Sequence, residues 1–310
     1  MSVVQKFYEV KRSPRTSSPL ISTLAAVTLL APALFIMAAI LGYPLLYNLG
    51  LAFTNRSLRH YYEYKFVGLA NFVQLLNSRE FYAVLSRTSL FTVFNVVLQI
   101  GVGLGLAVLL TSKRLRAPAI YRSLMIVPWV IPVYISVLVW RSMFLTDFGL
   151  INQFLSSLGL NGLPWLTSGE LALGAIHIVQ LWLAYPFVMT VSLGALQSVP
   201  PELYEAAMID GAGTWSRFRL ITWPLIRPAM LFIALLTGNT TFQLFIVVWF
   251  LTRGGPAGKT DLVMTWGYKT AFVAHQYGYQ AAFMTVISII VMIIATVIIR
   301  QGGLLRGMER

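Results

Sequence analysis

The sequence contains no cysteine, which excludes disulfide bridges, thiolate-bound zinc and cysteine-based catalysis. Charge is also scarce, because only 11% of the 310 residues are charged and only 10 of them are acidic. In contrast, 57% of the residues are hydrophobic and the mean hydropathy is +0.75. A soluble domain of this size has no interior large enough for so much apolar surface, so the composition indicates a membrane protein.

Six long apolar stretches follow one another along the chain. Continuous apolar runs of about 18 residues or more are typical of transmembrane helices, whose backbone groups are satisfied within each helix. We find no alternating pattern of the kind that a membrane β-barrel requires. The sequence therefore predicts an all-α polytopic membrane protein with about six spans, at 22–53, 88–112, 119–146, 171–197, 226–252 and 281–300.

Acidic residues are missing from the cores of these spans. Asp147, Glu170, Asp210 and Asp261 all lie in loops or at the ends of spans. Proton-driven transport usually needs a titrating group inside the membrane, so this absence argues against it. His177 is the candidate exception, although a lone histidine on a helix is more often structural than a proton relay. No combination of nucleophile and base indicates an intramembrane enzyme.

The net charge of +13 has two interpretations, nucleic-acid binding or basic cytoplasmic loops. The second suits a membrane protein better and predicts no nucleic-acid partner. With a cytoplasmic N-terminus, 14 of the 23 Lys and Arg residues fall on the inside. We therefore expect both termini in the cytoplasm, with short tails at 1–21 and 303–310 around a membrane domain at 22–302. The first span is longer than the apolar region of a signal peptide, so we expect it to be retained.

This orientation makes residues 198–225 a cytoplasmic loop. Pro200 and Pro201 can end one helix and begin another, with Glu202 in the favourable first turn. Gly211 and Gly213 permit a sharp turn before a basic amphipathic segment that ends at Pro224. A helix–turn–helix on the membrane surface follows from these residues. By itself this pattern is equally compatible with a loop that only anchors the ends of two spans.

A resemblance favours a more specific interpretation. The sequence "EAAMIDG", nine residues and then "ITWP" resembles the EAA loop in membrane subunits of binding-protein-dependent ABC importers. Trp223 stands where the family usually has leucine, which keeps the position apolar. In that family the loop docks on the ATPase subunit. The resemblance implies this coupling role for Glu205, Ala206, Ala207, Asp210 and Gly211.

The resemblance extends over most of the chain. The segments "FVGLANFVQLL" (66–76), "WLAYPFVM" (182–189), "FLTRGGP" (250–256) and "TDLVMTWGYKTAF" (260–272) are similar to the larger membrane subunit of maltose and maltodextrin importers. The best-known maltose subunit has two further N-terminal helices and a large periplasmic domain that this sequence does not contain. Contacts made by that domain therefore cannot be carried over.

The family implies partners as well as a fold. It predicts the type I importer permease fold in a bacterial or archaeal cytoplasmic membrane. It also predicts a dimer of ATPase subunits, an extracytoplasmic sugar-binding protein and a second, homologous permease subunit, although a homodimer stays open. ATP and magnesium would be bound by the ATPase, so no cofactor is expected in this chain.

One motif imitates a nucleotide site. The segment "RGGPAGKT" (253–260) ends in Gly-Lys-Thr, as a phosphate-binding loop does. That motif needs a glycine five positions before Gly258, where this chain has Arg253. The segment also follows no predicted strand. We therefore expect ATP hydrolysis in a separate subunit and no enzymatic activity here.

Two sets of residues are candidates for the substrate path. On the fifth span, residues with spacing i, i+3, i+4 and i+7 form one face that coincides with sugar-contacting positions of the maltose family. These are Thr237, Thr240, Thr241 and Leu244. Threonine hydroxyls alternatively bond to carbonyls of their own helix. Asn239 and Gln243 lie nearly opposite, and we expect them to bond to neighbouring helices.

The fourth span carries the second set. Leu183, Ala184 and Phe187 match family positions, and Gln180 shares their face. Pro186 can kink this span. The family example has glycine and tyrosine where this chain has Ala184 and Phe187, so specificity for maltose itself is open.

The favoured hypothesis is a permease that moves an oligosaccharide inward by alternating access, with maltose, maltodextrin or trehalose as candidates. An ABC permease for another small solute, such as glycerol phosphate, is the alternative. A secondary carrier would be expected to show inverted halves, broken helices and a buried acid. None of these is visible in the sequence.

Overall fold

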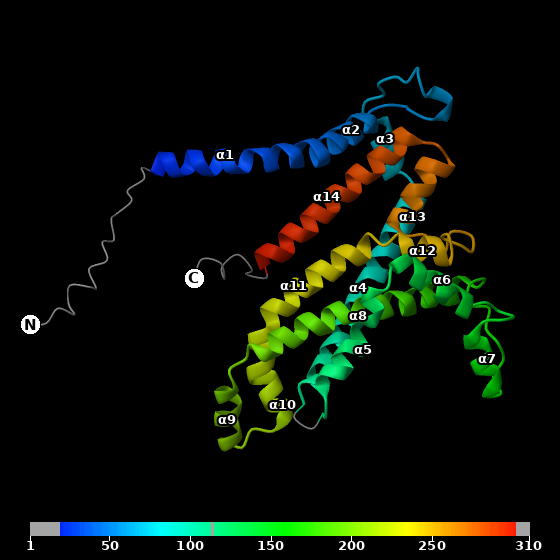
Figure 1. Cartoon of the computed structure of the whole chain (residues 1–310). Helices are drawn as coiled ribbons and strands as arrows, with labels where there is room; N and C mark the ends of the chain where they lie inside the picture. Colours follow the sequence, from blue (N-terminus) through cyan, green and yellow to red (C-terminus); the bar gives the residue numbers. More distant parts are fainter. Residues whose placement is uncertain (1–18, 113–114, 302–310) are drawn as a thin grey trace, which may run out of the picture. The chain divides into compact units, whose positions relative to one another are not determined.

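The computed structural model describes residues 19–112 and 115–301 (Figure 1). Over these residues the secondary structure is helical, apart from one isolated bridge between Thr54 and Phe66. The predicted all-α class is confirmed. Five helices are long and apolar enough to cross a membrane, and a bent helix pair brings the number to six in the described part.

The chain divides into two compact units, residues 1–51 and 52–310. In the first unit, α1 (Pro19–Met37) continues through the π-helical η2 (Ala38–Gly42) into α2 (Tyr43–Ala52). Large apolar side chains are exposed along this helix, as a lipid-facing span requires. Of the expected tails, residues 1–18 and 303–310 lie outside the described residues.

The second unit contains the remaining elements. They are η3 (Leu58–His60), α3 (Ala70–Leu76), α4 (Arg79–Leu110), α5 (Pro118–Val130), α6 (Val133–Met143), α7 (Leu150–Ser157), α8 (Gly169–Gln197), α9 (Pro201–Ile209), α10 (Thr214–Arg217), η4 (Phe218–Thr222), α11 (Trp223–Phe242), α12 (Ile246–Leu251), α13 (Val263–Tyr268), η5 (Lys269–Val273) and α14 (Tyr277–Gln301).

Helix α4 begins nine residues before the expected start of its span at residue 88. Ser78 caps it by accepting a hydrogen bond from the Phe81 amide at 3.3 Å, and Glu80 lies in the first turn. A capped first turn with an acid is stable without apolar residues. A prediction from hydropathy alone therefore did not include the polar first turns of α4.

The expected span at 119–146 is formed by two helices with a sharp bend between them. Helices α5 and α6 meet at an angle of 91°. Pro132 has no amide hydrogen to continue the helix, and Ile131 before it is extended, at φ −72° and ψ 133°. The residue before a proline is disfavoured in the helical conformation, which explains the break.

The expected span at 226–252 is also broken. Helix α11 ends at Phe242 and the chain resumes as α12 at Ile246. The two interrupted regions meet, because α6 and α12 pack together around Val137, Val247 and Leu251. The structure thus contains interrupted helices that were not visible in the sequence.

Helix α4 lies against both α8 and α11 and forms the centre of the second unit. Gly103 allows α4 to lie close to α8, because a Cβ atom at this position would be only 2.6 Å from Cγ1 of Val188. Figure 1 shows α9 and α10 at one end of this unit and α12 and α13 at the other. The loop at 198–225 and the loop at 252–262 thus occupy opposite ends of the helices.

Candidate functional site

The predicted coupling segment forms a separate short helix, α9. It begins at Pro201 after the extended Pro200, and Glu202 lies in its first turn. Proline is well tolerated in a first turn, where its missing amide hydrogen would have no partner inside the helix. The two prolines therefore determine where this helix starts.

Gly211 determines where α9 ends. Its φ is +77°, in the left-handed region that glycine adopts without strain. The Gly211 amide donates to the Met208 carbonyl at 3.1 Å, and the Ala212 amide donates to the Ala207 carbonyl at 2.8 Å. These two bonds form a Schellman motif. The glycine of the EAA pattern is thus explained by backbone geometry.

The outer surface of α9 is apolar and exposed. Leu203, Met208 and Ile209 are exposed, Ile209 to 87%, and Trp215 in α10 is exposed beside them in sequence. Among the predicted coupling residues, Glu205, Ala206, Asp210 and Gly211 are exposed and Ala207 is half-buried. Clustered apolar side chains on a surface that also carries charge are typical of a protein-binding site.

The opposite side of α9 is attached to the membrane helices. Tyr204 packs against a core that contains Val199, Ile226 and Met230. Its hydroxyl lies 2.8 Å from Oγ1 of Thr222, a buried residue of η4. This contact, which sequence reasoning missed, joins the coupling helix to the segment that leads directly into α11.

The four candidates on α8 lie in or near the core. Gln180 and Leu183 are each 8% exposed, whereas Ala184 and Phe187 are half-buried. Leu183 belongs to the cluster that includes α6 and α12, and the Phe187 ring lies 5.9 Å from the Trp129 ring of α5. Helix α8 continues through Pro186 as one element.

The four candidates around the end of α11 differ in exposure. Thr237 and Thr241 are buried and Thr240 is exposed. Leu244 is buried but lies beyond the end of the helix, so it does not continue the helical face of Thr237. The hydroxyls of Thr237 and Thr240 donate to Ile233 and Leu236 carbonyls at 2.8 and 3.1 Å, which is the back-bonding alternative.

Asn239 and Gln243 differ from expectation as well. Both are exposed, and Nε2 of Gln243 donates to Oδ1 of Asn239 at 2.7 Å. This bond therefore lies within their own segment rather than to a neighbouring helix. The bond spans i to i+4 across the end of α11.

A row of buried polar residues on α4 was not identified from the sequence. Oγ1 of Thr88 accepts from the Val263 amide at 3.0 Å, Nδ2 of Asn95 lies 2.7 Å from Nδ1 of His177, and Nε2 of Gln99 lies 3.4 Å from Oγ1 of Thr241. The spacing 88, 95 and 99 follows one helical face and is the signal that could have revealed it. His177 thus contacts a buried side chain of α4, which suits a structural role better than a proton relay.

The Gly-Lys-Thr segment folds into a loop held by bonds from α4 and by bonds within the loop. Nη1 of Arg87 donates to the Gly258 and Asp261 carbonyls at 2.8 and 2.9 Å, and Oγ1 of Thr260 donates to the Gly255 carbonyl at 2.7 Å. No strand precedes it in the described part of the chain. A phosphate-binding loop needs free backbone amides between a strand and a helix. Here the amides of Lys259, Thr260 and Asp261 donate to carbonyls of the same loop.

Asp261 anchors this loop. Its Oδ2 lies 2.8 Å from Nζ of Lys269, while the side chain is almost completely buried. Burial raises the pKa of the Asp261 carboxyl, although the hydrogen bond and charge of Lys269 and the charge of Arg87 lower it in part. The described residues contain no group of three or more potential metal ligands.

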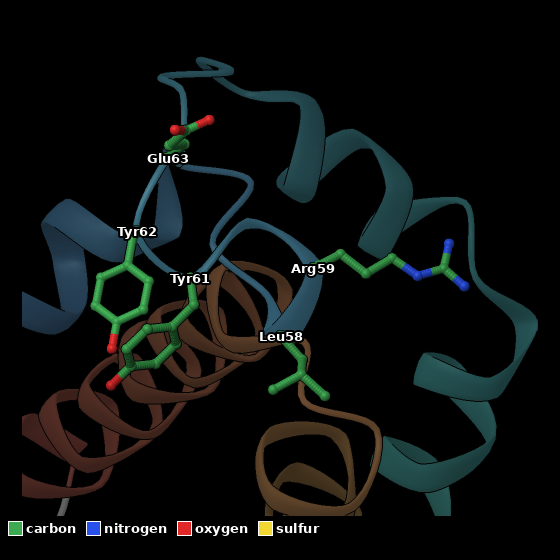
Figure 2. Close-up of a pocket in the computed structure, with 5 residues that line it drawn as sticks. All are labelled: Leu58, Arg59, Tyr61, Tyr62 and Glu63. Carbon is green, nitrogen blue, oxygen red and sulfur yellow. The ribbon is translucent and has the colours of Figure 1, made fainter.

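A surface depression of about 530 Å³ lies away from the coupling segment. It is lined by Leu58, Arg59, Tyr61, Tyr62 and Glu63 (Figure 2). The Tyr61 and Tyr62 rings lie together, 5.0 Å apart, and Arg59 extends away from them. All five residues come from one exposed loop. Trp and Tyr side chains are enriched where a membrane meets water, which suits this loop.

Residues 99–302 match the family described as "Binding-protein-dependent transport system inner membrane component". This match covers more than half of the chain. It includes α8, the coupling segment, α11 and all of α14, so it spans both of the regions that the sequence singled out.

Individual relatives agree. The chain is 34% identical to the galactooligosaccharides transport system permease protein GanP of Bacillus subtilis over 87% of this chain and 68% of the relative. It is 33% identical to the trehalose/maltose transport system permease protein MalF of Thermococcus litoralis, over 77% and 81%. For the maltose/maltodextrin permease protein MalF of Salmonella typhimurium the identity is 34%, over 74% of this chain and only 48% of the relative.

A solved structure shares the fold. A chain in the crystal structure of a bacterial ABC transporter involved in import of the acidic polysaccharide alginate aligns over 90% of this chain and 95% of its own length. The TM-score is 0.77 at 20% identity, which establishes similarity of fold. Together with the EAA geometry at α9, the family match and the relatives show that this chain belongs to the inner membrane component family of binding-protein-dependent transport systems.

Proposed function

We propose that this chain is the permease subunit of an ATP-driven importer that moves a neutral oligosaccharide inward across the cytoplasmic membrane. Maltose, maltodextrin and trehalose are the leading candidates, since relatives named for these sugars are 31–34% identical to this chain. The relative named for galactooligosaccharides supports the same chemical class. Glycerol phosphate is disfavoured because α11 offers no cation near its polar end.

The coupling helix is the observation that carries this proposal. Helix α9 exposes an apolar surface with Glu205 at its edge, while Tyr204 ties the other side to the start of α11. An element that is free on one side and attached on the other can pass a displacement from a partner to the membrane helices. The partner would be an ATPase subunit, which binds ATP and magnesium in place of this chain.

The remaining partners follow from the geometry of docking. An ATPase dimer has two docking clefts and this chain has one coupling segment, so a second permease subunit completes the complex. An extracytoplasmic binding protein would deliver the sugar to the end of the helices opposite α9. Closure of the ATPase dimer would then drive the change between outward-open and inward-open states.

The test reconstitutes the chain with its co-purifying subunits and binding protein in lipid vesicles. ATP hydrolysis is measured with maltose, maltodextrin, trehalose, a galactooligosaccharide and glycerol 3-phosphate. We expect stimulation by a neutral sugar in the wild type. In Glu205→Ala we expect weaker stimulation, because Glu205 can pair with a basic group of the ATPase.

A matched pair of variants separates docking from general disturbance. Ile209→Asp and Tyr62→Asp both place a carboxylate at positions that are almost fully exposed, 87% and 89%. Only Ile209 lies on the surface of α9. Loss of ATPase co-purification in Ile209→Asp alone supports the proposal. If both variants bind the ATPase equally, α9 is not the docking surface and only anchors the ends of two membrane spans.

A further inference from the structure

Helix α7 lies against α6, at the end of the helices away from α9 (Figure 1). Gly149 precedes it, and a Cβ atom there would collide with the Leu145 carbonyl oxygen. Gly159 follows it at φ +76°, and the Leu160 amide donates to the Leu155 carbonyl at 2.9 Å. Two glycines therefore determine where this short helix begins and ends.

One side of α7 is attached to the membrane helices. Asn152 is only 4% exposed, and its Nδ2 donates to the Thr146 and Leu163 carbonyls at 3.0 and 2.9 Å. Its Oδ1 accepts from Nε1 of Trp165 at 2.9 Å. The Trp165 ring packs against the core that α6, α8 and α12 share. Helix α7 thus cannot move without the outer ends of these helices.

The other side of α7 carries two different stripes. Leu150, Phe154 and Leu158 follow one another at intervals of four residues and are 60–64% exposed. Gln153 and Ser156 are also exposed and lie on the opposite flank of the helix. Water around the whole helix would disfavour the first stripe, and lipid around the whole helix would disfavour the second. Such an amphipathic helix suits the boundary between lipid and water.

The apolar stripe continues the exposed apolar surface of the preceding span. Leu138 and Val139 of α6 and Leu145 directly after it are exposed, and α6 is part of the bent spanning pair. Exposed apolar side chains on a spanning helix suit contact with lipid chains. Phe148, which is 80% exposed, lies between this surface and Leu150. The same surroundings therefore extend to α7.

Charge favours the uncharged part of the bilayer as the occupant. Asp147 is the only charged residue between Arg141 and Glu170, so the segment offers no cation to an anionic headgroup or an acidic protein. A binding protein that dissociates after delivery would use an interface about as polar as the rest of its surface. The stripe contains no polar side chain. Acyl chains and the glycerol region of the leaflet fit it best.

We infer that α7 lies in the surface of the bilayer, with Leu150, Phe154 and Leu158 among the lipid chains and Gln153 and Ser156 in water. Through Asn152 the leaflet then holds the end of the bent pair α5–α6 at a fixed depth. The proposed function enters only through the orientation, which makes this the outer leaflet. The contact with lipid is the same whichever solute is carried.

The absence of cysteine allows a spin label at a single chosen position. Phe154→Cys and Ser156→Cys place a nitroxide on the apolar and the polar stripe, about 200° apart around the helix. Leu29→Cys, at an 81% exposed position of α1, is the lipid reference, and Tyr62→Cys, at an 89% exposed loop position, is the aqueous reference. The complex with its co-purifying subunits is placed in nanodiscs of zwitterionic lipid. A complex with the unmodified chain gives the background from cysteines of its partners.

Electron paramagnetic resonance measures collisions of the label with oxygen, which concentrates in lipid, and with a neutral nickel complex, which stays in water. We expect a severalfold higher ratio of oxygen to nickel collisions for Phe154→Cys than for Ser156→Cys. The first should resemble the lipid reference and the second the aqueous reference. A saturating amount of the binding protein should leave the ratio for Phe154→Cys unchanged.

Three results would overturn the inference. Equal preference of both labels for the nickel complex would place α7 in water. Few collisions with either reagent at Phe154→Cys would show that another subunit covers the stripe. Nickel collisions that disappear only when the binding protein is added would make the stripe a docking surface for that protein. Leu158→Cys, on the same stripe, repeats the test should Phe154→Cys not assemble.

Discussion

The coupling segment at 198–225 and the end of the fifth apolar stretch at 236–245 are both polar regions within apolar surroundings. In the first, two prolines and one left-handed glycine define the beginning and end of α9. In the second, no proline or glycine lies between Asn239 and Phe245, although the helix ends there. The first region is therefore determined by its own residues, and the second by its packing against other helices.

The difference also concerns which side chains are accessible. Helix α9 has one attached side, through Tyr204, and its other side is exposed. Around the end of α11, neighbouring residues alternate between burial and exposure, with Thr241 fully buried and Thr240 exposed. A periodicity argument can locate a face of a helix, but only the neighbours decide whether that face is covered.

The largest effect is expected from the glycine that ends α9. Gly211→Val forces a β-branched residue into the left-handed region, at a cost of about 3 kcal/mol. Gly213→Val is the control, because Gly213 has φ −66° and open space around a Cβ atom. Sugar-stimulated ATP hydrolysis should fall more than about tenfold in the first variant only. Equal losses would show that the segment tolerates no side chain at either glycine.

A smaller effect is expected from the buried contact between α4 and α11. Thr241→Val leaves the Gln99 amide without this partner and should destabilise the protein by about 1–2 kcal/mol. The double variant Gln99→Leu with Thr241→Val removes both polar groups and should recover part of that loss. Thermal unfolding in detergent measures both. A double variant less stable than Thr241→Val would contradict the role given to this pair.

The contact between the coupling helix and η4 should contribute about 1 kcal/mol. Tyr204→Phe and Thr222→Val each remove one of its two hydroxyls, and a double-mutant cycle isolates their interaction. We expect a lower number of sugar molecules transported per ATP, with basal hydrolysis retained. Tyr185→Phe, which removes a different tyrosine hydroxyl bond to the Met125 carbonyl, is the control. If Tyr185→Phe lowers the number of sugar molecules transported per ATP equally, the contact between Tyr204 and Thr222 has no specific role in coupling.

The smallest effect concerns the loop at the opposite end. The pKa of Asp261 is raised in the folded protein, so its protonation favours the folded state. Its contribution is fully present below the unfolded pKa of about 3.9 and is lost as pH rises through the folded pKa. Between about pH 7 and pH 4, the wild type should therefore gain stability relative to Asp261→Asn, by less than about 1 kcal/mol. A parallel pH dependence of the two melting temperatures would contradict this.

The sequence predicted the helical class, the six apolar regions and the helix–turn–helix at 198–225, because composition, proline and glycine act locally. It did not predict the break after Phe242, since no proline or glycine marks the end of the helix there. It also missed the contact of Tyr204 with Thr222 and that of Asn95 with His177, which join residues 18 and 82 positions apart. Such contacts depend on how the helices pack together.

One further consequence follows from the continuity of α10, η4 and α11. Residues Thr214–Phe242 form a single helical rod of 29 residues, about 44 Å long. Its first turn adjoins the coupling helix and its last turn carries Asn239. The π-helical turns of η4 are the one irregular section, and they lie near the coupling end. A displacement of that end would therefore tilt the rest of the rod as one body, with the bending concentrated in η4.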